Sequence, residues 1–156
     1  MLSTIIIIWA IFNVLIGLWE IYIFQNRSKL YLEQESIFSS GKKISNFFID
    51  GWAEYCKVDS RYIIKPYVWG FELLNAILAF AFIISVMFYP NWMKFVLILQ
   101  IVNCSGYFLT LLLELLQKNE VYVNLKKYSS LWMIPTYYFI SFIWILVPSY
   151  IISKMY

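Results

Sequence analysis

Four long apolar runs constrain the fold of this chain more than any other feature of its sequence. They cover residues 4–24, 67–89, 92–116 and 130–152. A transmembrane helix needs about 20 mostly apolar residues to cross the hydrocarbon core of a bilayer. Charged residues make up only 13% of the chain, about half the share of soluble domains, so a soluble protein is excluded. The sequence predicts an all-α integral membrane protein: one domain, residues 1–156, built as a four-transmembrane-helix bundle.

The segments between the apolar runs predict one interfacial helix and otherwise loops. Residues 25–65 form a long predicted loop. Within it, apolar residues recur at near-helical spacing over residues 44–55, which predicts a short amphipathic helix lying on the membrane. The dipeptide Pro90-Asn91 predicts a tight turn, which makes the second and third spans antiparallel neighbours. Residues 118–129 are polar and predict a further loop.

Polar residues inside the first two spans are candidates for positions that face the centre of the bundle. Asn13, Gly17 and Glu20 have the i, i+4, i+7 spacing that places them on one helix face. Glu20 lies near the end of its run, so a position at the membrane interface is the alternative. Glu72 lies inside the second span, where an ionisable group costs about 2–3 kcal/mol or more. It is therefore expected to face a partner within the bundle.

Two features of the later spans concern helix packing. Asn103 and Gly106 are three residues apart on the third span, which favours close packing and a hydrogen bond to a neighbouring helix. In the fourth span, Pro148 predicts a kink, because proline lacks the N–H of a helix hydrogen bond. Cys56 and Cys104 do not form a disulfide framework, and we expect both thiols to be reduced.

The segment from Trp52 to Tyr62, called the signature segment below, concentrates charges and aromatic rings just before the second span. Four charged residues are interleaved with three aromatic ones. Tryptophan and tyrosine rings favour the membrane–water interface, so we expect the segment at a membrane mouth. An ordinary aromatic belt with snorkelling basic side chains is the alternative interpretation.

The signature segment resembles the motif of the emopamil-binding family, whose members share the EXPERA membrane domain. The residues that fit the family string are Trp52, Glu54, Tyr55, Lys57, Asp59, Ser60, Arg61 and Tyr62. The family includes the sterol Δ8–Δ7 isomerase, a non-catalytic emopamil-binding-like branch and, more distantly, the sigma-2 receptor. The resemblance implies an EXPERA-like fold, residence in the endoplasmic reticulum and a homodimer.

Moving a double bond within a sterol requires a proton donor, a base, and a group that stabilises the intermediate carbocation. A buried acid pair can hold one proton, and a tryptophan face attracts a cation. The resemblance places such roles on Glu72 and Trp144, and Pro148 also matches the family. The His and Glu that the isomerase carries on its first span fall on Asn13 and Gly17. The chain contains no histidine.

Glu20 is the candidate replacement for the missing acid, because it lies one turn beyond it and could pair with Glu72. The predicted catalytic residues are therefore Glu72, Glu20 and Trp144. The predicted substrate-binding residues are Asn13, Asp59, Arg61, Tyr62, Asn103, Tyr107 and Ser141. Tyr107 stands where the family has an acid, and Ser141 where it has an asparagine. We expect no metal site and no cofactor.

Three functions remain open on this basis. A sterol isomerase would use the Glu20–Glu72 pair for proton transfer. A non-catalytic relative would bind, transport or chaperone a sterol or an amphiphilic amine, with Glu72 as the counter-charge. A structural subunit would use its spans only for association within the lipid bilayer. The net charge of +3 is small and scattered, which excludes nucleic acid as a partner.

The side of the membrane on which the loops lie has two predictions. Residues 25–65 and 118–129 together hold ten of the twelve basic residues. The positive-inside rule then places both segments in the cytosol and both termini in the lumen. The family resemblance implies the opposite orientation, with the signature segment on the lumenal side, and we favour that orientation.

Overall fold

The computed structural model describes residues 2–32, 47–128 and 133–155. Within these ranges the chain folds into helices and contains no strand. Three helices are long and apolar enough to cross a membrane. They are Ser3–Leu30, Val68–Phe88 and Pro90–Leu116. Their length and composition indicate a membrane protein, in agreement with the hydropathy of the sequence.

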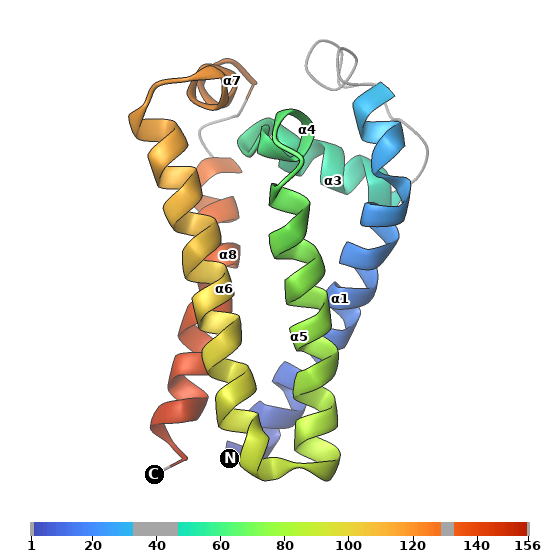
Figure 1. Ribbon diagram of the computed structural model, residues 1–156, viewed down its shortest axis with the longest axis vertical. Helices are drawn as coiled ribbons and strands as arrows, with labels where there is room; N and C mark the ends of the chain where they lie inside the picture. Colours follow the sequence, from blue (N-terminus) through green and yellow to red (C-terminus); the bar gives the residue numbers. More distant parts are fainter. Residues whose placement is uncertain (1, 33–46, 129–132, 156) are drawn as a thin grey trace.

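Four long helices run side by side along the long axis of the molecule (Figure 1). They are α1 (Leu2–Leu32), α5 (Val68–Phe88), α6 (Pro90–Leu116) and α8 (Met133–Ser153). Helix α1 packs on α5, α5 on α6 and α6 on α8, and α8 also touches α1, so the helices surround a common centre. The short helices lie at one end of the bundle and both termini at the other (Figure 1). Both predicted orientations require this arrangement.

Helix α1 continues past its predicted end at residue 24 to Leu32. The prediction that the loop begins at residue 25 is therefore wrong. Polar residues end a run of hydropathy, but they do not by themselves end a helix. Here their side chains bond back to the preceding turn: Asn26 Nδ2 donates to Tyr22 O at 2.9 Å, and Arg27 Nη1 donates to Phe24 O at 2.7 Å.

The predicted inward face of α1 is confirmed. Asn13 is 0% exposed, Glu20 is 4% exposed, and Gly17 is buried between them. The alternative position of Glu20 at the membrane interface is therefore wrong. At Gly17 a Cβ atom would lie 3.3 Å from Ala79 Cβ and 3.5 Å from Ala76 Cα. Glycine thus lets the backbones of α1 and α5 approach closely, as small residues do in membrane bundles.

The signature segment lies on two short helices, α3 (Phe47–Val58) and α4 (Arg61–Ile64), and on the turn Asp59-Ser60 between them. Helix α3 lies across the end of the bundle (Figure 1). Residues 47–55 of the predicted amphipathic helix are helical, its position on the membrane stays a prediction, and residues 44–46 lie outside the described residues. Its apolar face packs against the bundle. The buried residues of that face are Ile49, Trp52, Ala53 and Cys56.

The connection between α5 and α6 is shorter than predicted. Helix α6 begins at Pro90, and Tyr89 alone separates the two helices. The predicted turn at Pro90-Asn91 is therefore wrong, because proline fits the first turn of a helix, where its missing N–H has no partner to lose. The antiparallel contact between α5 and α6 is confirmed.

The loop predicted over residues 118–129 is wrong at residues 120–128, which form helix α7 (Glu120–Tyr128), and residue 129 lies outside the described residues. Lys118 has a left-handed conformation with φ of 51°, which ends α6 and turns the chain. Asn119 then caps α7, since its Oδ1 accepts the backbone N–H of Val121 at 3.0 Å. Val121 is fully buried and packs in the same cluster as α3. The mostly polar composition of this segment led to the loop prediction, although one face of the helix is apolar.

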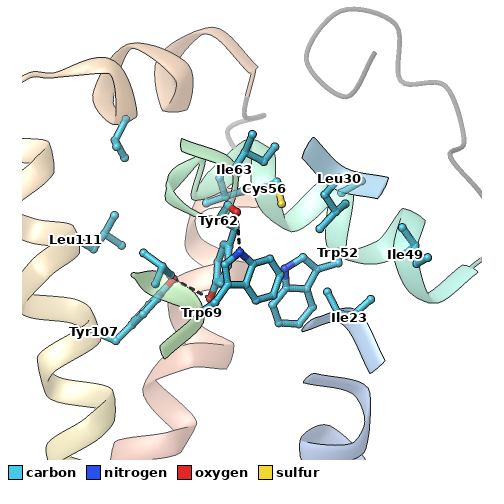
Figure 2. Close-up of a cluster of buried hydrophobic side chains, with 14 residues drawn as sticks. Ile23, Leu30, Ile49, Trp52, Cys56, Tyr62, Ile63, Trp69, Tyr107 and Leu111 are labelled. Carbon is cyan, nitrogen blue, oxygen red and sulfur yellow. Dashed lines mark hydrogen bonds between the residues drawn. The ribbon is translucent and has the colours of Figure 1, made fainter. Parts of the chain in front are cut away.

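Pro148 lies inside helix α8, and the kink predicted there stays a prediction. Residues 130–132 of the predicted fourth span lie outside the described residues. The apolar helical stretch Ser141–Ser153 is shorter than the three spans identified above. Two hydrophobic clusters stack along the bundle. The first gathers at the α3 end around Trp52, Tyr62 and Trp69, whose rings lie close together in Figure 2. The second lies toward the termini and includes Trp144.

Candidate functional site

An internal cavity lies between the two hydrophobic clusters, where the four long helices meet α3. Its volume is about 90 Å³. Small-molecule pockets usually measure about 300–1,000 Å³, so this conformation admits a polar head group and not a whole sterol. The cavity wall is mostly aromatic, with a few polar groups. The lining residues are Phe12, Ile16, Trp19, Glu20, Trp52, Tyr55, Phe71, Glu72, Asn75, Asn103, Cys104, Tyr107, Ser141 and Trp144.

Two carboxyl groups meet in the wall of this cavity. Glu20 on α1 and Glu72 on α5 interact with one another. Asn75, one turn beyond Glu72, donates Nδ2 to Oε1 of Glu20 at 2.8 Å. Outside the carboxyl pair itself, Oε2 of Glu20 accepts no hydrogen bond from the part of the chain that the structure describes. The fold therefore brings together the two acids that the sequence selected.

Tyr62 and Tyr107 connect this pair to the signature end of the bundle. The hydroxyl of Tyr62 donates to Oε1 of Glu72 and lies 3.4 Å from the hydroxyl of Tyr107. The Tyr107 hydroxyl in turn donates to Oδ2 of Asp59. Trp69 fixes the backbone at Tyr62, because its Nε1 donates to the Tyr62 carbonyl at 3.0 Å (Figure 2). A row of polar groups thus joins Glu72 to Asp59.

Asp59 and Arg61 form a buried ion pair at the end of that row. Arg61 Nε donates to Asp59 Oδ1 at 2.9 Å and Nη2 donates to Oδ2 at 2.6 Å, with both side chains 0% exposed. Arg61 Nη1 also donates to Thr110 Oγ1 at 2.7 Å and to the Tyr107 carbonyl at 3.3 Å. Neither Asp59 nor Arg61 lines the cavity. Arg61 lies over the Tyr107 ring, 4.5 Å from its centroid, and Asp59 accepts the Tyr107 hydroxyl. The two residues therefore fix the position of Tyr107, which itself lines the cavity.

The remaining charges of the signature segment behave like an ordinary interfacial pair. Lys57 Nζ lies 2.5 Å from Glu54 Oε1, and the Glu54 side chain is 53% exposed. The aromatic-belt interpretation therefore fits these two residues but is wrong for Asp59 and Arg61. Cys56 is a free, buried thiol. Burial and the nearby Asp59 carboxylate raise the pKa of the Cys56 thiol well above its ordinary value.

Asn13 and Asn103 bind neighbouring groups on opposite sides of the pair. Asn13 accepts Gln100 Nε2 at 2.5 Å and donates to the Trp9 carbonyl at 2.7 Å, and it does not line the cavity. Asn103 lines the cavity and donates Nδ2 to the Phe71 carbonyl at 3.0 Å. The predicted interhelical hydrogen bond of Asn103 is thus confirmed. Asn13 joins α1 to α6 through its hydrogen bond with Gln100 and lies outside the cavity.

Helix α8 contributes Ser141 and Trp144 to the cavity wall. The Trp144 ring packs against Trp9 with ring centroids 5.1 Å apart and against Phe12 at 5.7 Å. The Ser141 hydroxyl lies 3.4 Å from the hydroxyl of Tyr55 on α3. Aromatic packing therefore fixes Trp144 in the wall of the same cavity as the carboxyl pair, as a cation-stabilising role would require.

Sequence reasoning missed several residues with polar groups that line the site, among them Asn75, Trp52 and Tyr55. Asn75 binds Glu20, and a signal for it existed, because it lies three residues after Glu72 and hence on the same helix face. Trp52 lines the cavity, yet in the sequence it belongs to the signature segment with no sign that it faces a site. Among the described residues, no three His, Cys, Asp or Glu side chains gather as metal ligands.

Comparison of the chain with protein-family models, curated proteins and solved structures finds no significant match to any of them. The function is therefore argued from the geometry and chemistry of the cavity.

Proposed function

We propose that the protein binds the polar head of a membrane amphiphile, either a sterol or an amphiphilic amine, at the Glu20–Glu72 pair. The observation that carries the proposal is the meeting of two carboxyl groups in an aromatic-walled cavity within a membrane bundle. Ionisable groups at this depth are costly and mark functional sites by default. The head group enters the cavity, and the apolar body of the ligand requires the helices to part further.

The proposal includes membership of the EXPERA-type emopamil-binding family. Its support is the string of matching residues in the signature segment, from Trp52 to Tyr62. With the family come three further proposals: α8 is a fourth membrane span, the protein resides in the endoplasmic reticulum, and it forms a homodimer. The helical length of α8, Met133–Ser153, supports the fourth span.

Sterol isomerisation is the second candidate function, and the acid pair beside Trp144 favours it. One carboxyl, protonated, would give its proton to a ring carbon of the double bond, leaving a carbocation on the neighbouring carbon. The other, ionised, would take a proton from an adjacent carbon, so that the double bond moves and the pair again holds one proton. The Trp144 ring would stabilise the cation. Glu20 would replace the missing acid of the first span, and the pair would work without the histidine.

A combined turnover and binding experiment tests both candidates. Purified protein in nanodiscs is incubated with a Δ8 sterol, product is read by mass spectrometry, and ligand protection is read by thermal unfolding. Glu72→Gln is the test variant, and Glu54→Gln, which alters an exposed carboxyl on α3, is the matched control. Product that only Glu72→Gln abolishes supports the isomerase. Protection without product, weakened only by Glu72→Gln, supports the binding protein. Neither product nor protection, for sterol or amine, would overturn the proposal and leave a structural subunit.

A further inference from the structure

A second pocket lies on the outer face of the bundle, between α6 and α8, and is called the α6–α8 groove below. Its volume is about 410 Å³, which is larger than that of the central cavity and within the range of about 300–1,000 Å³ of small-molecule pockets. The lining residues are Phe108, Leu109, Leu111, Leu112, Leu115, Tyr138 and Phe142. Apart from the Tyr138 hydroxyl, these side chains offer only aliphatic and aromatic surface to a ligand.

Packing within the protein fixes the walls of the groove. The Phe108 and Phe142 rings stack with their centroids 4.8 Å apart, and the Phe108 centroid lies 6.4 Å from that of Tyr138. Leu111 is 2% exposed and belongs to the hydrophobic cluster at the α3 end, so it forms a fixed floor. Leu112, in contrast, is 52% exposed. The groove is therefore a preformed apolar depression on a helix that is long and apolar enough to cross a membrane.

The groove leads along α6 to a lysine at the signature end of the bundle. The lining residues Phe108, Leu112 and Leu115 lie on one face of α6, which ends at Leu116. The backbone N–H of Lys118 donates to the Leu115 carbonyl at 3.1 Å, so Lys118 lies one turn beyond the last residue of the groove. The Lys118 side chain is exposed and forms no ion pair within the described ranges. An ammonium group on a flexible stem is thus available beside the groove.

Further basic residues lie at the same end of the bundle as this lysine. Helix α7 ends with the exposed Lys126 and Lys127 (Figure 1). Two carboxylates lie in the same region. Glu114 has a cation of its own, because Lys65 Nζ lies 3.7 Å from its Oε1. Glu120 stands in the first turn of α7, where the helix dipole stabilises a negative charge. The surface at this end of the groove therefore carries an excess of positive charge.

We propose that the α6–α8 groove binds an acyl chain of an anionic phospholipid, whose phosphate lies at Lys118 and the lysines that end α7. The hydrocarbon chain matches the apolar walls, and the phosphate matches the lysines. Basic pockets between membrane helices bind anionic lipid head groups for the same reason. The apolar helix of a second copy of this chain would cover the leucines but would bring no anion to the lysines. The groove is separate from the Glu20–Glu72 cavity, so the proposal goes beyond the proposed function and does not depend on it.

A lipid titration of the unaltered protein provides the first test. Delipidated protein in detergent is mixed with phosphatidylserine or phosphatidylcholine of identical acyl chains, and the bound lipids are counted by native mass spectrometry. One phosphatidylserine per chain is expected to bind at least about fivefold more tightly than phosphatidylcholine, which is the gain from one engaged lysine. Equal affinities, or phosphatidylserine that adds without saturation, would overturn the proposal. Glycerophosphoserine has the head group without acyl chains, so it should not compete. Full competition would show that the lysines bind anions without the groove and would also overturn the proposal.

Leu112→Trp tests the groove, and Leu113→Trp is the matched control. The two leucines are neighbours on α6 and are 52% and 49% exposed, but only Leu112 lines the groove. An indole at position 112 takes the space of the acyl chain, so phosphatidylserine should bind about tenfold more weakly. At position 113 it should leave the affinity unchanged. Equal affinities of the two variants would contradict the proposal. A dimer that forms without lipid and that only Leu112→Trp dissociates would assign the groove to a second copy of the chain and overturn the lipid assignment.

Lys118→Gln tests the position of the phosphate, with Lys154→Gln as the matched control. Lys154 is also exposed but lies near the C-terminus, at the opposite end of the bundle (Figure 1). Lys118→Gln should lower the affinity for phosphatidylserine about fivefold and leave that for phosphatidylcholine unchanged, whereas Lys154→Gln should change neither. An unchanged preference for phosphatidylserine in Lys118→Gln would refute the assigned head-group position. If Leu112→Trp does not fold, the lipid titration and this pair of variants still decide.

Discussion

The protein buries acidic groups in two regions, and the regions differ in how completely those groups are satisfied. Asp59 lies against Arg61, Tyr107 and the amide of the turn, with both side chains of the ion pair 0% exposed. Glu20 and Glu72 interact with each other and form no ion pair among the described residues, and one oxygen of Glu20 has no hydrogen-bond donor there outside the pair. The first region resembles a completed network, and the second resembles a site that awaits a ligand.

This difference shows why motif residues and site residues need not coincide. The most distinctive charges of the signature segment, Asp59 and Arg61, serve to hold Tyr107 and the α4 turn in place. The groups available to a ligand come mainly from the long helices, where the sequence looks almost uniformly apolar. A buried polar network in which every hydrogen bond is made rigidifies a fold. Where some hydrogen bonds are not made within the protein, a ligand can form them and gain binding free energy.

The largest expected effect comes from breaking the completed network. Arg61→Met leaves Asp59 as an uncompensated buried charge, which should lower the free energy of unfolding by about 3–5 kcal/mol. Lys57→Met, which removes a cation of the same segment from an exposed pair, should cost less than about 1 kcal/mol. Unfolding in detergent measured for both variants provides the check. Equal stability of the two variants would show that the Asp59–Arg61 pair is not the structural element described here.

Removing one hydrogen bond from the same network should have an intermediate effect. Tyr107→Phe deletes the hydroxyl that donates to the Asp59 carboxylate, a charged acceptor, so we expect a loss of about 1.5–3 kcal/mol. Tyr55→Phe removes a hydroxyl that lies 3.4 Å from a neutral partner, Ser141, and should cost no more than about 1 kcal/mol. Thermal unfolding of the two variants in the same nanodisc preparation compares them directly. A smaller loss for Tyr107→Phe would count against the network.

Acid-to-amide substitutions contrast the two regions most directly. Asp59→Asn should fall with Arg61→Met among the strongly destabilised variants, because it leaves the guanidinium unpaired. Glu20→Gln keeps an acceptor for Asn75 and removes the repulsion from Glu72, so stability should change by less than about 1 kcal/mol. Ligand protection should nevertheless be lost. If Glu20→Gln unfolds the protein as readily as Asp59→Asn does, the carboxyl pair is structural and the comparison fails.

The smallest expected effect is a dependence of stability on alkaline pH. Since the pKa of the Cys56 thiol is raised in the folded protein, the unfolded chain loses this proton first as pH rises. Stability is therefore unaffected below the ordinary thiol pKa of about 8.5 and falls above it. Cys56→Ala should remove part of that fall. Unfolding temperatures of both proteins at neutral pH and near pH 10 measure the difference, and parallel curves would show that another group is responsible.

The sequence by itself determined the membrane class, three of the long helices and the inward face of α1. These features follow from local properties, because hydropathy sets the solvent of a segment and the 3.6-residue period sets its face. The same local signals identified Asn13, Gly17 and Glu20 as neighbours, and Glu72 as a residue in need of a partner. They failed at residues 25–32 and 120–128, where polar composition led to a loop prediction for helices that no proline or glycine interrupts.

The tertiary structure alone decided which of these groups meet and which stay apart. That Glu20 reaches Glu72, that Arg61 lies behind Tyr107 and not at the cavity, and that Trp52 keeps an uncommitted N–H all depend on how helices distant in sequence pack together. Helices α1 and α5, which carry the two carboxyl groups, approach each other closely at Gly17. Contacts of this kind depend on distances and angles between helices, which local periodicity does not encode.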